Sequence, residues 1–260
     1  MLAGLLVLCG LLAGACGSGP DGGSGAPATG GRTPRTVRVL VASSLAGVAP
    51  ALSRAYERTH PGTRVEWSAA ASSALVAQVR AGAPADAVVL ADRATADAVA
   101  PAPAPGGTSS GGPAADPRVV ASNVLVLAVP ATNPGGVRTL ADLARPDLLV
   151  GLCAPQVPCG RYARDLLRRS GVTASVDTEE PDARSLMAKV ASGDLDAALV
   201  YRTDVRSSAG RARAVSVPAA ADVPVRYFSV SRSADGRSVT GFLEGRQGQR
   251  VLRSAGFGPP

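Results

Sequence analysis

Short apolar runs alternate with stretches of helix-spaced apolar residues along most of the chain. The runs are of strand length and predict buried strands at 37–41, 63–67, 87–91, 122–130, 148–152 and 196–201. Between the first two runs, at 37–41 and 63–67, Leu45, Val48 and Leu52 recur at the spacing of one helix face. Strands that alternate with helices predict an α/β fold with mostly parallel sheets.

Small polar residues stand where several of these helices begin, directly after a strand. The expected helix starts are at Ser44, at Ser72, at Cys159 with Gly160, and at Asp182 with Ala183. Ligands bind at the carboxyl edge of parallel strands, and free N–H groups at helix starts attract anions. The pattern therefore predicts a site for a buried anion, with ordinary helix capping by serine as the alternative.

Composition narrows the class of protein. The chain has 260 residues, of which 46% are hydrophobic and 18% charged, enough to bury the core of one large or two small domains. The net charge is +7, yet only 3% of the residues are aromatic and no basic run carries interleaved aromatics. A nucleic-acid partner is therefore not expected, whereas a weak attraction for anions is.

The first 35 residues differ from the rest. Residues 1–16 are apolar and small up to Cys16, and they resemble a bacterial lipoprotein signal peptide in which Cys16 is lipidated. Ala13 stands where Leu is commonest, and no Lys or Arg precedes the apolar run, so an ordinary cleaved signal peptide remains the alternative. Residues 17–35 are rich in Gly, Ser and Pro and predict a flexible tether, and 98–117 predict a surface loop.

Eight stretches, in chain order, carry a resemblance to a known family. They are VASSL (41–45), SSAL (72–75), AGAPAD (81–86), AD (91–92), NVLV (123–126), VPCGRYA (157–163), GDLDAALVY (193–201) and GRQGQRVLRSAGF (245–257). Together they resemble the periplasmic molybdate-binding proteins of ABC importers. The resemblance implies the two-lobed type II periplasmic-binding-protein fold, with lobe 1 formed by 36–122 and 229–260 and lobe 2 by 123–228.

The resemblance also implies the ligand and the residues that hold it. Molybdate, or tungstate, would lie between the lobes, and molybdenum would be present only as this oxyanion, without a further cofactor. Ser44 and Ser72 would bind it by hydroxyl and N–H, Cys159 and Ala183 by backbone N–H, and Tyr201 by its phenol. Cys159 stands where the family usually has Ala, and Ala183 where it often has Val.

The same resemblance implies the setting. The protein would be a monomer, lipid-anchored to the outer face of the cell membrane or periplasmic, and would deliver its ligand to an ABC transporter permease. A binding protein for sulfate or phosphate is an alternative. A serine hydrolase is a remote one, because no G-x-S-x-G motif stands between a predicted strand and a predicted helix and the only histidine, His60, lies in a predicted turn. We therefore expect a carrier and not an enzyme.

The cysteines suggest a crosslink. Loss of Cys9 with the signal peptide and lipidation of Cys16 would leave Cys153 and Cys159 in an oxidising compartment. A disulfide between them is expected, with free thiols or a metal site as alternatives.

Overall fold

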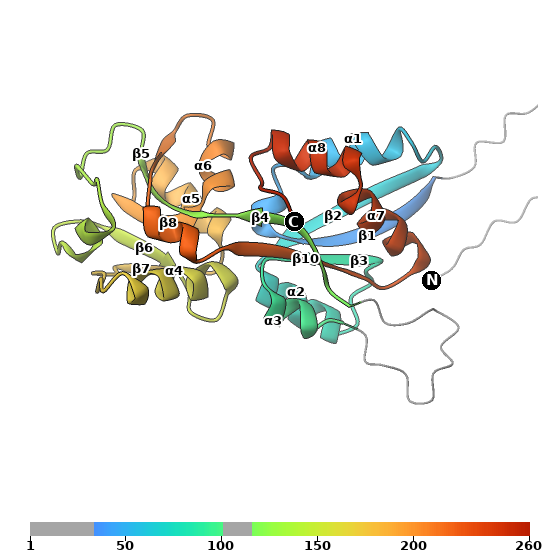
Figure 1. Ribbon diagram of the computed structural model, residues 1–260, viewed down its shortest axis with the longest axis horizontal. Coiled ribbons are helices and arrows are strands. Elements are labelled where there is room, and N and C mark those ends of the chain that lie inside the picture. Colours follow the sequence, from blue (N-terminus) through green and yellow to red (C-terminus); the bar gives the residue numbers. More distant parts are fainter. Residues whose placement is uncertain (1–33, 101–115) are drawn as a thin grey trace, which may run out of the picture. The chain divides into compact units, whose positions relative to one another are not determined.

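The computed structural model describes residues 34–100 and 116–260, and its folded part, Pro34–Pro260, is one compact unit. This unit contains two five-stranded sheets. The first sheet has the strand order β2-β1-β3-β10-β4 (Figure 1). Its strands, in chain order, are β1 (Arg35–Ala42), β2 (Thr63–Ala70), β3 (Ala87–Leu90), β4 (Arg118–Asn123) and β10 (Val225–Ser231).

The second sheet has the order β7-β6-β8-β5-β9. Its strands are β5 (Leu125–Pro130), β6 (Val150–Cys153), β7 (Thr178–Glu180), β8 (Ala197–Tyr201) and β9 (Ala212–Val215). In each sheet four strands point the same way, and only β10 in the first and β5 in the second run against the others. The expected α/β fold with mostly parallel sheets is confirmed.

Helices flank both sheets (Figure 1). The α-helices are α1 (Ala49–Glu57), α2 (Ser72–Arg80), α3 (Arg93–Asp97), α4 (Pro158–Arg169), α5 (Ala183–Ser192), α6 (Arg202–Ser207), α7 (Ala234–Glu244) and α8 (Arg246–Ser254). Short 3₁₀ turns are η1 (Ser43–Leu45), η2 (Leu140–Ala144) and η3 (Pro218–Asp222). We call the first sheet with α1, α2, α3, α7 and α8 the first lobe, and the second sheet with α4, α5 and α6 the second lobe.

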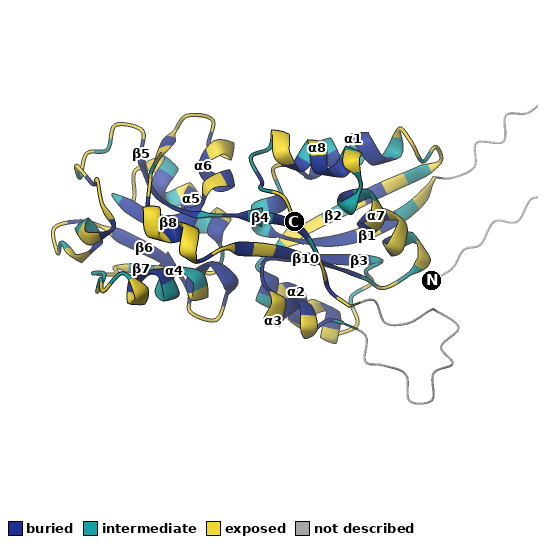
Figure 2. Cartoon of the chain, in the orientation of Figure 1, coloured by how far each residue is buried: buried dark blue, intermediate teal, exposed yellow. Residues whose placement is uncertain are grey.

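The apolar runs form the centres of the sheets. Every residue of β3, β5, β6 and β8 is buried, as expected for strands covered on both faces (Figure 2). Strand β2 lies at an edge, pairs only with β1, and is mostly exposed or half-buried. Burial therefore follows the position of each strand in its sheet.

The chain passes between the sheets twice. The apolar run expected as one strand at 122–130 is divided: β4 belongs to the first sheet, and β5, beginning after Val124, belongs to the second. The chain returns between β9 and β10. The boundary proposed after residue 228 falls inside β10, all of whose paired residues bond to β3 and β4.

Several expectations lie outside the described residues. They are the signal peptide at 1–16 with its lipidated Cys16, most of the tether at 17–35, and most of the loop at 98–117. Within 34–100 and 116–260, no helix has the length and apolar character needed to span a membrane.

Candidate functional site

A small cavity lies where the carboxyl ends of parallel strands from both sheets meet. Its volume is about 10 Å³, roughly the space that one water molecule needs, so a larger guest enters only if the lining segments move apart. The lining comes from the segments that follow β1, β2, β3, β6, β7 and β8: Ala42, Ser43, Ser44, Ala71, Ser72, Ala91, Val157, Pro158, Cys159, Asp182, Ala183 and Tyr201.

The five residues expected to bind the ligand all line this cavity: Ser44, Ser72, Cys159, Ala183 and Tyr201. The first two come from the first lobe and the other three from the second. They are up to 157 positions apart in the sequence, between Ser44 and Tyr201. The fold therefore brings the predicted set together at one sheet edge of each lobe, as the rule for α/β folds requires.

The serines do not cap helices, so the structure does not support the alternative of ordinary helix capping. Ser72 is the first residue of α2, whose N-cap is Ala71, and no side chain caps this helix. Ser44 lies in the 3₁₀ turn η1, and α1 begins only at Ala49. Pro50 lies in the first turn of α1, a position where proline is favoured because its missing N–H costs no hydrogen bond.

Both serine hydroxyls have hydrogen-bond partners within the first lobe. The Oγ of Ser72 accepts a hydrogen bond from the N–H of Ala91 at 3.1 Å, so its own proton is free to be donated elsewhere. The Oγ of Ser44 lies 2.8 Å from the phenol oxygen of Tyr227. Neither serine is hydrogen-bonded to an imidazole or a carboxylate in the described part of the chain, so neither has the base that a nucleophile needs.

In the second lobe, two helix starts offer backbone donors. Asp182 caps α5 as expected, accepting from the N–H groups of Arg184 at 2.8 Å and Ser185 at 2.9 Å. The N–H of Ala183 is the remaining donor of that first turn. Helix α4 begins at Pro158, so Cys159 carries its first N–H, and this residue is 4% exposed.

Tyr201 provides the fifth donor. It is 2% exposed, and its phenol oxygen has no hydrogen-bond partner among the described residues. Burial raises the pKa of this phenol well above its usual value, so the group stays protonated and can only gain by donating. A buried, unpaired hydroxyl costs free energy, and an acceptor bound in the cavity would recover it.

The cavity is lined by polar groups that carry no positive charge. No Lys or Arg is among its lining residues, and the Oδ1 of Asp182 is already taken up by two N–H groups of its own helix. A larger cleft of about 380 Å³ shares Ser43 and Ser44 with the cavity, and Arg184 and Arg211 line it. Two arginines therefore line a cleft that adjoins the cavity, where their charge would attract anions, whereas the lining of the cavity offers N–H and O–H groups.

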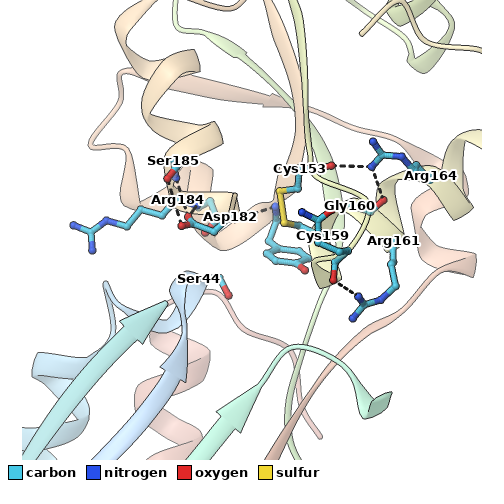
Figure 3. Close-up of a disulfide and its surroundings, with 12 residues drawn as sticks. Ser44, Cys153, Cys159, Gly160, Arg161, Arg164, Asp182, Arg184 and Ser185 are labelled. Carbon is cyan, nitrogen blue, oxygen red and sulfur yellow. Dashed lines mark hydrogen bonds between the residues drawn. A yellow bond between two sulfur atoms is a disulfide. The ribbon is translucent and has the colours of Figure 1, made fainter. Parts of the chain in front are cut away.

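The expected disulfide between Cys153 and Cys159 is present, with the Cα atoms 5.7 Å apart (Figure 3). It links the end of β6 to the first turn of α4. Gly160 packs so closely that a Cβ there would lie 1.9 Å from the carbonyl oxygen of Ala154. Arg164 further ties the turn by donating to the carbonyl oxygen of Cys153 at 2.8 Å. The Cys159 N–H is thus held by a rigid turn.

One ion pair joins the lobes beside the cavity. Arg161 of α4 donates to the carboxylate of Asp92, which caps α3 in the first lobe. The Asp92 side chain is 10% exposed, so the pair is shielded more than a surface salt bridge. Asp92 directly follows the lining residue Ala91, and Arg161 lies two residues after the lining residue Cys159.

Sequence reasoning missed β10 and the role of Tyr227. The segment Val225–Ser231 is rich in Val, Tyr and Phe and follows Pro224, which are signals of a strand that could have been used. Asn123 belongs to one of the motifs above, but the sequence does not indicate its contacts. The structure buries both side chains: Tyr227 lies beside Ser44, and Asn123 lies beside Tyr227.

Two α/β lobes with a donor-lined cavity between them define a binding protein of the periplasmic type. The chain belongs to the bacterial extracellular solute-binding protein family, whose model matches residues 37–258. It is 33% identical to the molybdate-binding protein ModA of Mycobacterium tuberculosis, over all of this chain and 97% of that relative.

Two solved structures share the fold. The periplasmic molybdate-binding protein of Azotobacter vinelandii superposes with a TM-score of 0.70 at 18% identity, covering 86% of this chain and 99% of the other. The sulfate-binding protein SubI of Mycobacterium tuberculosis gives the same TM-score and identity, covering 86% and 87%. Because carriers of two different anions match equally well, the fold alone does not choose the ligand.

Proposed function

We propose that this chain is the extracytoplasmic binding component of a molybdate ABC importer, which also accepts tungstate. The observation that carries the proposal is the cavity in which two serines, two backbone N–H groups and an unpartnered buried phenol converge. The full-length relationship to a molybdate-binding protein supports molybdate over other oxyanions.

The donor set is of the size that micromolar binding requires. Each hydrogen bond to a charged oxygen contributes about 1.5–3 kcal/mol net, and micromolar affinity requires about 8 kcal/mol. Five such bonds sum to about 7.5–15 kcal/mol, a range that includes this requirement before the costs of association and of ordering the lobes are subtracted. A tetrahedral dianion satisfies all of them at once because its four oxygens point in different directions.

The lobes must separate for the ligand to enter. Residues of both lobes line the cavity, and the Arg161–Asp92 pair bridges them next to it. Opening therefore breaks this pair and exposes the donors, whereas closing on the anion restores it. The closed, loaded form is the one that the permease receives, and the protein acts as a monomer.

Calorimetric titration of the mature protein with molybdate, tungstate, sulfate and phosphate tests the ligand. We expect molybdate and tungstate to bind with comparable affinity and a stoichiometry of one, with sulfate and phosphate weaker. If sulfate binds more tightly than molybdate, the protein is a sulfate carrier, the alternative that the second fold match keeps open.

Assays for turnover test the carrier role. Ester and phosphate-ester substrates should remain intact in the presence of the protein, because Ser44 and Ser72 lack a neighbouring base. Hydrolysis that disappears in Ser72→Ala would show an enzyme instead.

The anchor is tested separately. In the proposal, Cys16 is lipidated and holds the protein at the outer face of the membrane, since several acyl chains give stable attachment. Wild type should then partition into the detergent phase and Cys16→Ser into the aqueous phase. Recovery of the wild type from the aqueous phase would contradict the anchor but leave the ligand assignment intact.

A further inference from the structure

The hydroxyl of Ser44 is part of a buried chain of hydrogen bonds. Its Oγ lies 2.8 Å from the Oη of Tyr227, and this Oη lies 3.3 Å from the side-chain nitrogen of Asn123. The same nitrogen lies 2.8 Å from the Oγ1 of Thr203. Tyr227 is fully buried and Asn123 is 2% exposed.

The direction of this chain can be deduced from one end. The side-chain oxygen of Asn123 accepts the N–H of Val124 at 3.0 Å, so the amide NH₂ must face the other way. Its two hydrogens meet the oxygens of Thr203 and Tyr227, which makes the Tyr227 oxygen an acceptor. The phenol proton of Tyr227 is then left for its one remaining neighbour in the chain, the Oγ of Ser44.

Burial supports this direction because it keeps the phenol protonated. The pKa of Tyr227 is raised above its usual value mainly by desolvation, with the charge of Asp204 adding to the effect. Tyr227 also contacts Tyr201 edge-to-face, with ring centroids 6.2 Å apart. Tyr227 therefore contacts two hydroxyl-bearing residues of the cavity lining, Ser44 and Tyr201.

We propose that Tyr227 and Asn123 are positioning residues that fix the direction of the Ser44 proton. Ser44 accepts from Tyr227 and must therefore donate into the cavity. Neither Tyr227 nor Asn123 lines the cavity; they act through Ser44. The inference rests on the proposed function, since it assigns how one donor of that site is oriented.

A fixed orientation of the Ser44 hydroxyl affects which anions the cavity binds. Ser44 oriented as a donor serves a fully deprotonated oxyanion, whereas an oxyanion that carries a proton needs an acceptor at one of its oxygens. Without Tyr227 the Ser44 hydroxyl can rotate and accept. The chain of hydrogen bonds thus disfavours hydrogen phosphate relative to molybdate.

Tyr227→Phe is the central test, and Tyr56→Phe is its matched control. Tyr56 is a buried tyrosine of the same lobe whose hydroxyl donates to the Oγ of Ser238 at 2.8 Å, outside the cavity lining. We expect Tyr227→Phe to weaken molybdate binding by about three- to tenfold, as the free Ser44 hydroxyl loses its fixed orientation. At about pH 8, where inorganic phosphate carries a proton, the ratio of molybdate to phosphate affinity should also fall. Tyr56→Phe should change neither.

A double-mutant cycle separates orientation from packing. In a Ser44→Ala background, Tyr227→Phe should have no further effect on molybdate binding, because there is no hydroxyl left to orient. An equal loss in both backgrounds would show that Tyr227 acts only by packing and would overturn the proposal.

Asn123→Asp is a second route to the same result. A carboxylate at this position accepts from the Tyr227 phenol and draws its proton away from Ser44, so the affinity ratio should fall as it does in Tyr227→Phe. An unchanged ratio in both variants overturns the inference while wild-type molybdate binding stands. Wild type that fails to bind molybdate overturns the proposed function itself.

Discussion

The two lobes supply the cavity with different kinds of donor. The first lobe contributes hydroxyls, Ser44 and Ser72, each held by a hydrogen bond to a more distant part of its lobe. The second contributes the N–H groups of Cys159 and Ala183, held by helix starts, and adds the phenol of Tyr201. Hydroxyl donors disappear on substitution, whereas backbone donors persist. We therefore expect substitution of the two serines in the first lobe to weaken anion binding more than substitution of Cys159 or Ala183 in the second.

Removing hydroxyls should have the largest effect. Ser72→Ala, Ser44→Ala and Tyr201→Phe should each weaken molybdate binding about tenfold or more, because a hydrogen bond to a charged oxygen is lost in a desolvated site. Isothermal titration calorimetry measures the change, with Ser73→Ala as the control on the same helix. Unchanged affinity in both Ser44→Ala and Ser72→Ala would show that the anion lies elsewhere.

Asp204, which holds the backbone of Tyr201 in the second lobe, should make the stability of the protein depend on pH. Asp204 accepts the backbone N–H of Tyr201 at 3.0 Å, and burial raises the pKa of its carboxyl from 3.8 to about 7. The native state therefore holds a proton that the unfolded state releases, so the free energy of unfolding falls as pH rises between these two values.

Asp204→Asn removes this titration. The variant should gain stability relative to wild type by roughly 3 kcal/mol between about pH 4 and about pH 7, as measured by denaturant unfolding. Arg184 and Arg211 line the same cleft as Asp204, so the measurement is made at two salt concentrations to separate their charges. Parallel stability curves for the two proteins would show that Asp204 does not titrate in this range.

Loss of the disulfide should weaken molybdate binding less than loss of a hydroxyl, and its effect should be confined to the second lobe. Cys153→Ser should lower stability by about 2 kcal/mol, since the crosslink closes a short loop, with a sequence separation of 6. Molybdate affinity should fall only a few-fold, because the Cys159 N–H remains but its turn is less ordered before binding. Thiol titration of the denatured, unreduced protein gives the direct check: two free thiols would rule the crosslink out.

The smallest effect is expected at a backbone donor. Ala183→Gly keeps the N–H that faces the cavity and removes one methyl group, so molybdate affinity should change by less than about threefold. A loss as large as that of Ser72→Ala would erase the difference between the lobes.

Much of this protein is determined locally by its sequence. Buried strands such as β3 and β8 were predictable because an apolar run reflects burial on both faces. The Asp182 cap and the left-handed Gly193, at φ 88°, were predictable because each depends on its neighbours within one turn. The Cys153–Cys159 crosslink was predictable from the count of cysteines left in the mature chain, and the five cavity residues from the ordered motifs of the family.

Only the tertiary structure decided how the donors are held. Ser72 does not cap its own helix, which was the alternative from the sequence, but accepts the N–H of Ala91, the residue after β3. Ser44 meets Tyr227 across 183 positions of sequence, because the antiparallel register of β10 with β4 sets Tyr227 opposite Ala121 and brings it near Asn123. A hydroxyl can bond many partners at similar cost, and no local preference selects among them. The register of the sheets makes that choice.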